Sequence, residues 1–461
     1  MSISKSILFN TDSYKVSMSA QYPPDTTGVY SYIEARGGRF DNTVFFGLQA
    51  FIKEYLLNPV TQDEIDFATE LYAEHGEPFN RKGWEYILNE HGGYLPLRIR
   101  AVPEGSVVPI KNVLATVENT DPQVPWLTTW AEPAILRGIW YPTTVATQSW
   151  TIKQIIREYL ERTGDPATID FKLHDFGSRG VSSWESAGIG GAAHLVNFKG
   201  TDTISSLLFA RAYYGARMAG FSIPAAEHST ITSWGRENEA KAYANMLKQF
   251  GRQGSILAVV SDSYDIFNAV ENIWGGELRQ AVIDSGATVV IRPDSGDPET
   301  VVSRVIQLLD RKFGSTVNAK GYKVLNHVRV IQGDGVNEST IRCILSHLDL
   351  YGYSADNVAF GMGGALLQKL DRDTQSWAMK CSSVKIGGVW TPVQKDPVTD
   401  SGKRSKAGRV TLFRDRDGQY RSGVEDWEPD ALRTAYENGQ LLVDELFDTV
   451  RERANQPYLS R

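Results

Sequence analysis

An arginine and an aspartate stand two residues apart directly behind a short apolar run, in the segment ATVVIRPDSGDP at 287–298. The run at 289–291 is β-branched, and such a run closed by turn residues is typical of a strand buried on both faces of a parallel sheet. Arg292 and Asp294 would then lie at the carboxyl end of that strand, where α/β barrels and open α/β sheets carry their chemistry. The pair predicts a reactive loop, and a structural turn closed by an ion pair is the alternative.

Apolar runs of this kind recur, each ending in a compact turn, and helical patterns alternate with them. The segments are FKLHDFGSRG (171–180), SIPAAEHST (222–230), ILAVVSDSYD (256–265), VVIRPDSGD (289–297), VRVIQGDGV (328–336) and NVAFGMGG (357–364). This alternation predicts an α/β fold, an irregular (β/α) barrel of parallel strands whose strand ends meet at one mouth. The residues expected there are Asp175, Phe176, Arg179, Glu227, His228, Asp262, Arg292, Asp294, Gly333, Asp334, Gly335, Gly361, Gly363 and Gly364.

This set of side chains suits a phosphorylated sugar. The turns GDG at 333–335 and GMGG at 361–364 expose backbone N–H groups that can hold a monophosphate. Cationic side chains can neutralise phosphate or pyrophosphate, and the candidates are Arg179, Arg292, Arg372 and Lys380. Carboxylates can orient ribose hydroxyls or the waters around Mg²⁺, and the candidates are Asp262, Asp294 and Asp334. Phe176 can stack on an aromatic ring.

Several other chemistries are disfavoured. A zinc hydrolase needs several histidine ligands, and only His228 and His174 stand near strand ends. No G-x-S-x-G elbow, Walker loop or complete G-x-G-x-x-G is present. His228 follows Glu227 among hydroxyl residues, where a histidine can act as nucleophile, acid or base near neutral pH. A buried structural histidine is the alternative.

The two ends of the chain have a different pattern. Residues 1–150 mix short elements, with antiparallel strands expected at 97–102 and 113–117. We predict an N-terminal α+β domain over 1–150 and the catalytic barrel over 151–386. Residues 387–461 read as strands with a basic loop, and we expect them to pack back against the N-terminal domain.

Composition limits the partners and the compartment. The formal net charge of −7 argues against nucleic acid as the main partner, since nucleic-acid-binding surfaces are basic. Two cysteines, Cys343 and Cys381, cannot form a disulfide framework or a structural zinc site, so we expect a reducing cytoplasm. The N-terminal segment has no long apolar stretch, so no secretory signal is expected. The sequence contains no run of about 18 apolar residues, so no membrane span is expected.

Longer motifs follow one another through nearly the whole chain. They are TDSYK (11–15), YSYIEAR (30–36), VPEG (102–105), VENTDP (117–122), KLHDFGSRGVSS (172–183), AHLVNFKGTD (193–202), PAAEHSTIT (224–232), VVSDSYDI (259–266), IRPDSG (291–296), VIQGDGV (330–336), LLQKL (366–370), KDPV (395–398) and KRSKAGR (403–409). Together they resemble the nicotinamide phosphoribosyltransferase family of type II phosphoribosyltransferases. The resemblance implies a barrel plus an α+β domain from both chain ends, and a homodimer with active sites at the subunit interface. The implied reaction joins nicotinamide and 5-phosphoribosyl-1-pyrophosphate, with Mg²⁺, to give nicotinamide mononucleotide and pyrophosphate.

The same resemblance assigns roles to the base-binding residues. Phe176 would sandwich the nicotinamide ring against Tyr14 of the partner subunit. Asp202, in the motif KGTD, would accept a hydrogen bond from the carboxamide NH₂ and repel nicotinate. Arg292 would contact the amide side of the ring.

It also assigns the phosphate-binding and catalytic residues. Arg179, Asp262, Gly333, Asp334, Gly363, Gly364, Arg372 and Lys380 would bind the phosphoribosyl group and its phosphates. Asp12, Arg36, Lys395, Lys403 and Arg409 of the partner would form the rim of the site. The catalytic set would be Glu227, His228, Arg292 and Asp294, with Mg²⁺ held mainly by pyrophosphate and water near Asp294. His228 matches a histidine that is phosphorylated by ATP, which would make ATP a co-substrate or activator.

Some positions depart from the family pattern, among them Ser178, Ala258, Met362, Ala365 and Ala378. These departures leave the reaction class intact. The alternatives are a nicotinate phosphoribosyltransferase, for which Asp202 is the discriminating residue, and a non-catalytic ligand-binding or signalling relative.

Overall fold

The computed structural model describes residues 5–399, 404–424 and 430–456. The chain divides into two compact units. The barrel unit comprises 148–209 and 217–369, and the α+β unit comprises 1–147, 210–216 and 370–461. The strand at 377–386, which we expected to end the barrel domain, belongs to the α+β unit, because it pairs along its whole length with the strand at 26–35.

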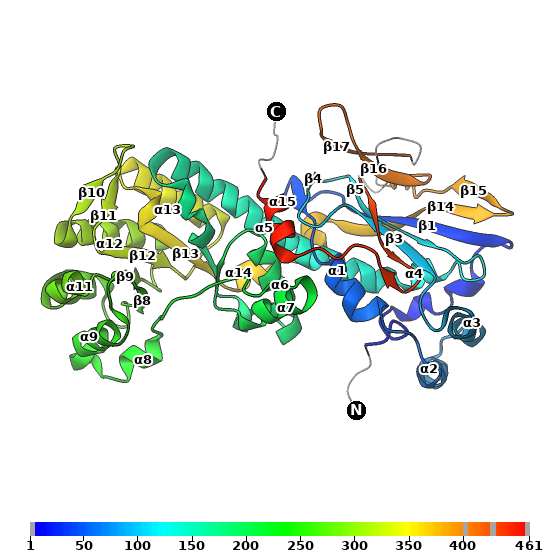
Figure 1. The fold of residues 1–461 in the computed structure, drawn as a ribbon, viewed down its shortest axis with the longest axis horizontal. Coiled ribbons are helices and arrows are strands. Elements are labelled where there is room, and N and C mark those ends of the chain that lie inside the picture. The colour runs from blue at the N-terminus through cyan, green and yellow to red at the C-terminus, as the bar shows by residue number, and fades with distance from the viewer. Residues whose placement is uncertain (1–4, 400–403, 425–429, 457–461) are drawn as a thin grey trace. The chain divides into compact units, whose positions relative to one another are not determined.

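The described part of the α+β unit is built on an antiparallel sheet of seven strands, drawn in Figure 1. In spatial order the strands are β15 (Val389–Pro392), β14 (Trp377–Ile386), β1 (Thr26–Ala35), β5 (Val113–Asn119), β3 (Leu97–Ala101), β18 (Arg433–Glu437) and β19 (Gln440–Leu441). The expected antiparallel strands are confirmed as β3 and β5, and β3 alternates buried and half-buried residues as its sequence LRIRA predicts. Strands from both chain ends therefore share one sheet.

Two-stranded sheets and helices complete this unit. The additional strands are β2 (Asn42–Val44), β4 (Val107–Pro109), β16 (Val410–Arg414) and β17 (Tyr420–Val424). The helices are η1 (Ser13–Lys15), η2 (Met18–Ala20), α1 (Leu48–Phe51), the π-helical η3 (Ile52–Leu56), α2 (Gln62–His75), α3 (Arg81–His91), α4 (Leu127–Trp130), η9 (Arg372–Gln375) and α15 (Phe447–Ala454). Helix α2 starts directly after Thr61 because Thr61 and Glu64 form a capping box.

The barrel unit contains a parallel sheet, and this confirms the predicted fold class. In spatial order its strands are β7 (Gly200–Thr201), β6 (Leu173–Asp175), β13 (Val358–Met362), β12 (Val328–Gln332), β9 (Thr288–Arg292) and β8 (Ile256–Val260). The strand expected at 222–230 forms only isolated parallel bridges, from Phe221 to Gly200 and from Ala225 to Ala258. Because this segment touches both edge strands, it closes the barrel irregularly.

Helices flank the parallel strands in the order expected for β/α units (Figure 1). They are η4 (Pro166–Phe171), η5 (Ser178–Gly180), α6 (Trp184–Leu195), α8 (His228–Thr232), η6 (Arg236–Asn238), α9 (Glu239–Phe250), α10 (Ile266–Asn268), the π-helical η7 (Ala269–Glu277), α11 (Arg279–Ser285), α12 (Pro298–Phe313), α13 (Glu338–Leu350), η8 (Ala355–Asn357) and α14 (Gly364–Leu367). Strands β10 (Ser315–Val317) and β11 (Lys323–Leu325) form a hairpin. Helices α5 (Glu132–Thr163) and α7 (Ile204–Tyr214) contribute residues to both units.

Helix caps keep the loops after two of the strands short. Asp297 accepts a hydrogen bond from the N–H of Thr300 and Pro298 occupies the first turn of α12, while Asn337 caps α13 through Ser339 and Thr340. The polar residues behind β9 and β12 therefore have little freedom to move from the strand ends. Among the described residues, no helix has the length and apolar character needed to traverse a bilayer.

Glu104, in the motif VPEG, is buried in the α+β unit. Its Oε1 accepts a hydrogen bond from the N–H of Gln49 at 2.7 Å, and its Oε2 accepts one from the hydroxyl of Tyr214 at 2.8 Å. Burial raises the pKa of Glu104 from its ordinary 4.5 to about 7, although both hydrogen bonds act in the opposite direction. A carboxyl group that joins three segments of the chain is therefore partly protonated near neutral pH.

We expect Glu104→Gln to gain stability relative to the wild type as pH rises from 4.5 to 7. In that window the native state holds a proton that the unfolded state has lost, so the contribution of Glu104 to the free energy of unfolding falls with rising pH. The difference between the two proteins should change by on the order of 2–3 kcal/mol, measured by urea unfolding at pH 5 and pH 8. Glu90→Gln, at an exposed position, is the control, and a pH-independent difference would contradict the assignment.

Candidate active site

A pocket of about 260 Å³ lies at the carboxyl ends of the parallel strands, within the barrel unit. Its lining among the described residues comes from the loops after β6, β9, β12 and β13. The lining residues are Phe176, Arg179, Gly180, Arg292, Asp294, Gly333, Asp334, Gly363 and Gly364. All but Gly180 are among the site residues that the sequence predicted. Parallel pairing therefore gathers these residues from four separate segments.

The ring of Phe176 is seated on glycines. A Cβ atom built on Gly361 would lie 1.9 Å from Cε2 of Phe176, and one on Gly333 would lie 3.3 Å from the same atom. The backbone N–H of Phe176 donates to the carbonyl of Met362 at 3.0 Å, which fixes the start of the loop. The ring is half-buried and packs on the apolar cluster of Ala258, Val290 and Ile331. One face of the pocket is therefore an aromatic surface.

Charged groups form a connected network at the carboxyl ends of β8 and β9. Arg292 Nη2 lies 3.3 Å from Asp294 Oδ2, and the backbone N–H of Asp294 donates to Asp262 Oδ2 at 2.9 Å. His228 Nε2 lies 3.4 Å from Asp294 Oδ2 and 3.7 Å from Asp262 Oδ1, and its Nδ1 lies 3.2 Å from Ser263 Oγ. The sequence left two interpretations of Arg292 and Asp294, a reactive loop and a turn closed by an ion pair. The structure agrees with both, because the two residues form an ion pair and also line the pocket.

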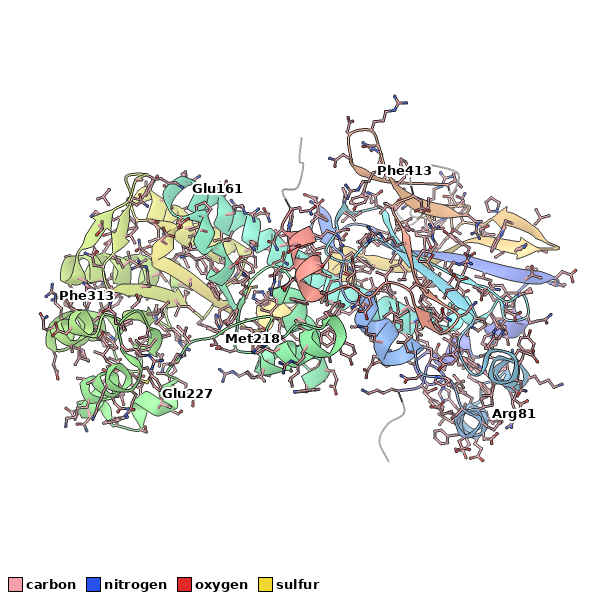
Figure 2. The ribbon with its side chains drawn as sticks, in the orientation of Figure 1. Arg81, Glu161, Met218, Glu227, Phe313 and Phe413 are labelled. Carbon is pink, nitrogen blue, oxygen red and sulfur yellow. The ribbon has the colours of Figure 1, made fainter. Side chains whose placement is uncertain are left out.

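Glu227 is placed differently from the other candidate catalytic residues. It is the N-cap of α8, where its backbone N–H donates to the Thr230 hydroxyl at 3.3 Å and its side chain accepts a hydrogen bond from the Ser229 hydroxyl. Figure 2 shows Glu227 at the start of that helix. Glu227 does not line the pocket, and its position supports a structural role in orienting His228, the first residue of α8.

Asp202 follows β7 and is linked to β6. Its Oδ1 accepts hydrogen bonds from His174 Nε2 at 3.0 Å and from Ser222 Oγ at 2.5 Å. Burial opposes ionisation of Asp202, but these two hydrogen bonds and the charge of Arg292 outweigh it and lower its pKa below the ordinary value. Asp202 is therefore an anion at neutral pH. The sequence alone did not indicate these contacts of His174 and Ser222, although His174 stands two residues before Phe176 and hence on the same face.

Glycines let two loops approach each other at the edge of the pocket that Gly180, Gly363 and Gly364 line. A Cβ atom on Gly180 would lie 3.0 Å from the Cα of Gly364, closer than side chains normally pack. Arg179 is exposed at this edge. Closely spaced glycine backbones beside one arginine are suited to binding a phosphate group.

The remaining predicted residues lie in the α+β unit, and they are Asp12, Tyr14, Arg36, Arg372, Lys380, Lys395 and Arg409. Lys403 lies outside the described residues. Burial, together with the positive charges of Arg36, Lys15 and Lys395, lowers the pKa of Lys380, so several predicted cations do gather. Tyr14 is 55% exposed.

Arg409 and Arg372 have partners of their own. Arg409 donates to Glu118 Oε2 at 2.8 Å and stacks on the rings of Tyr30 and Trp390, a position that favours a structural role over a rim role. Arg372 pairs with Asp373 at 2.9 Å on the surface. Exposed ion pairs of this kind contribute little to stability.

No group of three or more histidine, cysteine or acidic side chains suited to holding a metal ion occurs among the described residues. One buried acceptor is nevertheless open to a cation. Asp262 Oδ1 is buried and, within the described part of the chain, has no hydrogen-bond partner. Carboxylate oxygen is a ligand that Mg²⁺ prefers, and Mg²⁺ usually takes few protein ligands when phosphates supply the rest.

A parallel barrel with this pocket, joined to an α+β unit from both chain ends, defines the type II phosphoribosyltransferase class. The family model described as "Nicotinate phosphoribosyltransferase (NAPRTase) family" matches residues 171–440, and that of the nicotinamide phosphoribosyltransferase N-terminal domain matches residues 6–99. The chain therefore belongs to the nicotinate phosphoribosyltransferase family and carries the N-terminal domain of the nicotinamide phosphoribosyltransferases.

Curated relatives support this assignment, and two solved structures share the fold. A nicotinamide phosphoribosyltransferase of Xanthomonas campestris is 59% identical over 97% of this chain and 98% of its own length. One of Acinetobacter baylyi is 33% identical over 96% of each chain. The fold is similar to a nicotinate-nucleotide pyrophosphorylase structure from Pyrococcus furiosus (TM-score 0.62, 15% identity, 97% and 94% coverage). It is also similar to human nicotinic acid phosphoribosyltransferase (TM-score 0.57, 15% identity, 96% and 92% coverage).

We expect Gly361→Ala to disable the pocket. The new Cβ would overlap the Phe176 ring, which would have to swing into the space that a ligand needs. Steady-state kinetics should show a fall in kcat/KM of roughly 10²-fold, the usual effect of moving a binding group by about 1 Å. Gly276→Ala is the matched control, because the nearest atom to its Cβ, the carbonyl oxygen of Glu271, is 3.7 Å away. Equal activity of the two variants would contradict the described seat of Phe176.

Proposed function

We propose that the protein transfers the phosphoribosyl group of 5-phosphoribosyl-1-pyrophosphate to nicotinamide, giving nicotinamide mononucleotide and pyrophosphate for NAD salvage. The observation that carries the proposal is the pocket, in which an aromatic ring, two arginines, two aspartates and close glycine backbones meet. The relatives named nicotinamide phosphoribosyltransferase support it.

The base-binding end would recognise an uncharged pyridine. Phe176 offers its face to the ring, and Arg292 donates toward the carboxamide oxygen. Asp202 accepts from the carboxamide NH₂ and, as an anion, repels the carboxylate of nicotinate. The charge of Asp202 therefore disfavours the alternative function, a nicotinate phosphoribosyltransferase.

The reaction needs no general base, because the pyridine nitrogen of nicotinamide already carries a free electron pair. It attacks C1 of the ribose while pyrophosphate departs. The protein's contribution is to hold both partners in line and to stabilise positive charge on the ribose and negative charge on the leaving group. Asp294 and Asp334 would hold the ribose, Arg179 the pyrophosphate, and Gly363 and Gly364 the 5′-phosphate.

Mg²⁺ would be held mainly by pyrophosphate and water, with Asp294 and Asp262 as the nearest carboxylates. Asp262 Oδ1 supports this placement, because it is buried and, among the described residues, accepts no hydrogen bond, although His228 Nε2 lies 3.7 Å away. When bound, Mg²⁺ would offset the charge of the departing pyrophosphate.

We expect Asp202→Asn to shift base preference toward nicotinate. The amide removes the repulsion of the nicotinate carboxylate and can donate a hydrogen bond to it, while nicotinamide loses a charged acceptor. The kcat/KM for nicotinate should rise and that for nicotinamide should fall, each by roughly tenfold. Formation of both mononucleotides by wild type and variant is the measurement. A wild type that prefers nicotinate would overturn the proposed substrate.

ATP would stimulate the reaction through phosphorylation of His228. The side chain of His228 is 45% exposed at the first turn of α8, and the carboxylates of Asp262 and Asp294 lie beside it. These carboxylates can orient the ring so that one nitrogen faces the phosphoryl donor.

We expect ATP to raise the rate of mononucleotide formation by the wild type, and His228→Ala to bring the ratio of the rates with and without ATP close to one. His347→Ala, on α13, is the control and should keep the wild-type ratio. Acid-labile phosphate on the wild type after incubation with labelled ATP should accompany the stimulation. A wild type indifferent to ATP would remove this part of the proposal.

A homodimer would complete the site with Tyr14 and Arg36 of the partner. Exposed large apolar side chains of the barrel unit support an interface, among them Trp184 and Ile204, both 67% exposed, and Met218 at 53%. Activity should return when Phe176→Ala and Tyr14→Ala subunits are mixed, because half of the hybrid sites are intact. Two inactive variants that fail to complement would argue against shared sites. A cytoplasmic location stays a prediction from the two free cysteines.

A further inference from the structure

Only one carboxylate oxygen of Asp202 accepts side-chain hydrogen bonds from the described part of the protein. Within the described part of the chain its side-chain hydrogen bonds, from His174 Nε2 at 3.0 Å and Ser222 Oγ at 2.5 Å, both reach Oδ1. The backbone N–H of Asp202 also donates to the carbonyl of Asp175 at 3.0 Å, so the main chain is held as well. Oδ2 is left as the acceptor for a ligand. Because a carboxylate has only acceptors, His174 must carry its proton on Nε2.

We propose that His174 is a positioning residue that sets the selection of the base: with Ser222 it locks Asp202 so that Oδ2 meets the carboxamide NH₂ of nicotinamide. This inference rests on the proposed function. It extends that function from the residue that touches the base to the pair of donors that orient it.

The imidazole ring of His174 packs against a glycine residue on a neighbouring strand. In the sheet register His174 lies between Gly200 of β7 and Gly361 of β13. A Cβ atom on Gly200 would lie 2.6 Å from His174 Nδ1, so any larger residue would displace the ring. Gly361 does the same for Phe176, and the His174 and Phe176 rings lie 5.3 Å apart at an angle of 57°. The two glycines thus place the ring that would stack on the base and the ring that orients Asp202 side by side.

The exposure of the pair argues that it serves binding more than stability. The Asp202 side chain is 47% exposed and that of His174 is 13% exposed. A pair with one solvent-exposed partner contributes little to folding whether or not the imidazole is charged, so removing the pair costs little stability. A carboxylate that can rotate freely, in contrast, loses orientation entropy each time it binds a ligand.

The test compares variants of the full-length enzyme by steady-state kinetics with nicotinamide and nicotinate. His174→Leu keeps the bulk of the side chain and removes the donor, and it should raise the KM for nicotinamide roughly tenfold while kcat changes far less. His174→Gln, which retains an N–H donor, should restore most of the affinity. Nicotinate should remain a poor substrate in both, because the Asp202 charge is retained, unlike in Asp202→Asn.

Two further substitutions address the same geometry without altering His174. Ser222→Ala should raise the KM for nicotinamide, whereas Ser222→Thr, which keeps the hydroxyl, should not. Gly200→Ala removes no polar group but displaces the imidazole, so it should reproduce the kinetic effect of His174→Leu.

The outcomes separate this inference from the proposed function. An active wild type whose KM for nicotinamide is unchanged in His174→Leu and Gly200→Ala overturns the positioning role alone. So does equal impairment of His174→Leu and His174→Gln with a lowered melting temperature, since that marks a structural role. A wild type that forms no nicotinamide mononucleotide overturns the proposed function, and the inference with it.

Discussion

Parallel hydrogen bonding between β6, β13, β12 and β9 is the constraint on which the pocket depends. The registers Phe360 with Leu173, Val330 with Val358 and Val328 with Val289 fix where each strand ends. Parallel strands bring their carboxyl ends to one edge, so loops that are far apart in sequence share a single mouth. A slip of one residue in any strand would turn its loop to the other face and dismantle the site.

Inside that mouth, glycines provide space, and charged residues position the loops and attract the ligand. Glycines at 200, 333 and 361 leave room for rings or ligand, whereas Asp262 holds the loop of Asp294 through its backbone N–H. The chain has a formal net charge of −7, and yet Arg179 and Arg292 face the pocket. Attraction for an anionic substrate is therefore local, because it depends on where the few cations stand and not on the overall charge.

Local patterns predicted the strand-end loops well because buried parallel strands are continuous apolar runs, as at 289–291. They failed where long-range pairing decides. β7 is only Gly200–Thr201 and has no apolar signal, and β14 joins the α+β unit because its partner β1 lies at the other end of the chain. The roles of single residues could not be predicted for the same reason. Nothing in the sequence marks Glu227 as a helix cap, Arg409 as the partner of Glu118, or His174 as the partner of Asp202.

A crystal structure with nicotinamide mononucleotide bound would test the central claim most directly, namely that these loops form one cup for ring and phosphate. We expect the pyridine ring to lie against Phe176, with its carboxamide within hydrogen-bond distance of Asp202, and the 5′-phosphate to lie at the backbone of Gly363 and Gly364. A nucleotide bound elsewhere, or one whose pyridine ring makes no contact with Phe176, would contradict it.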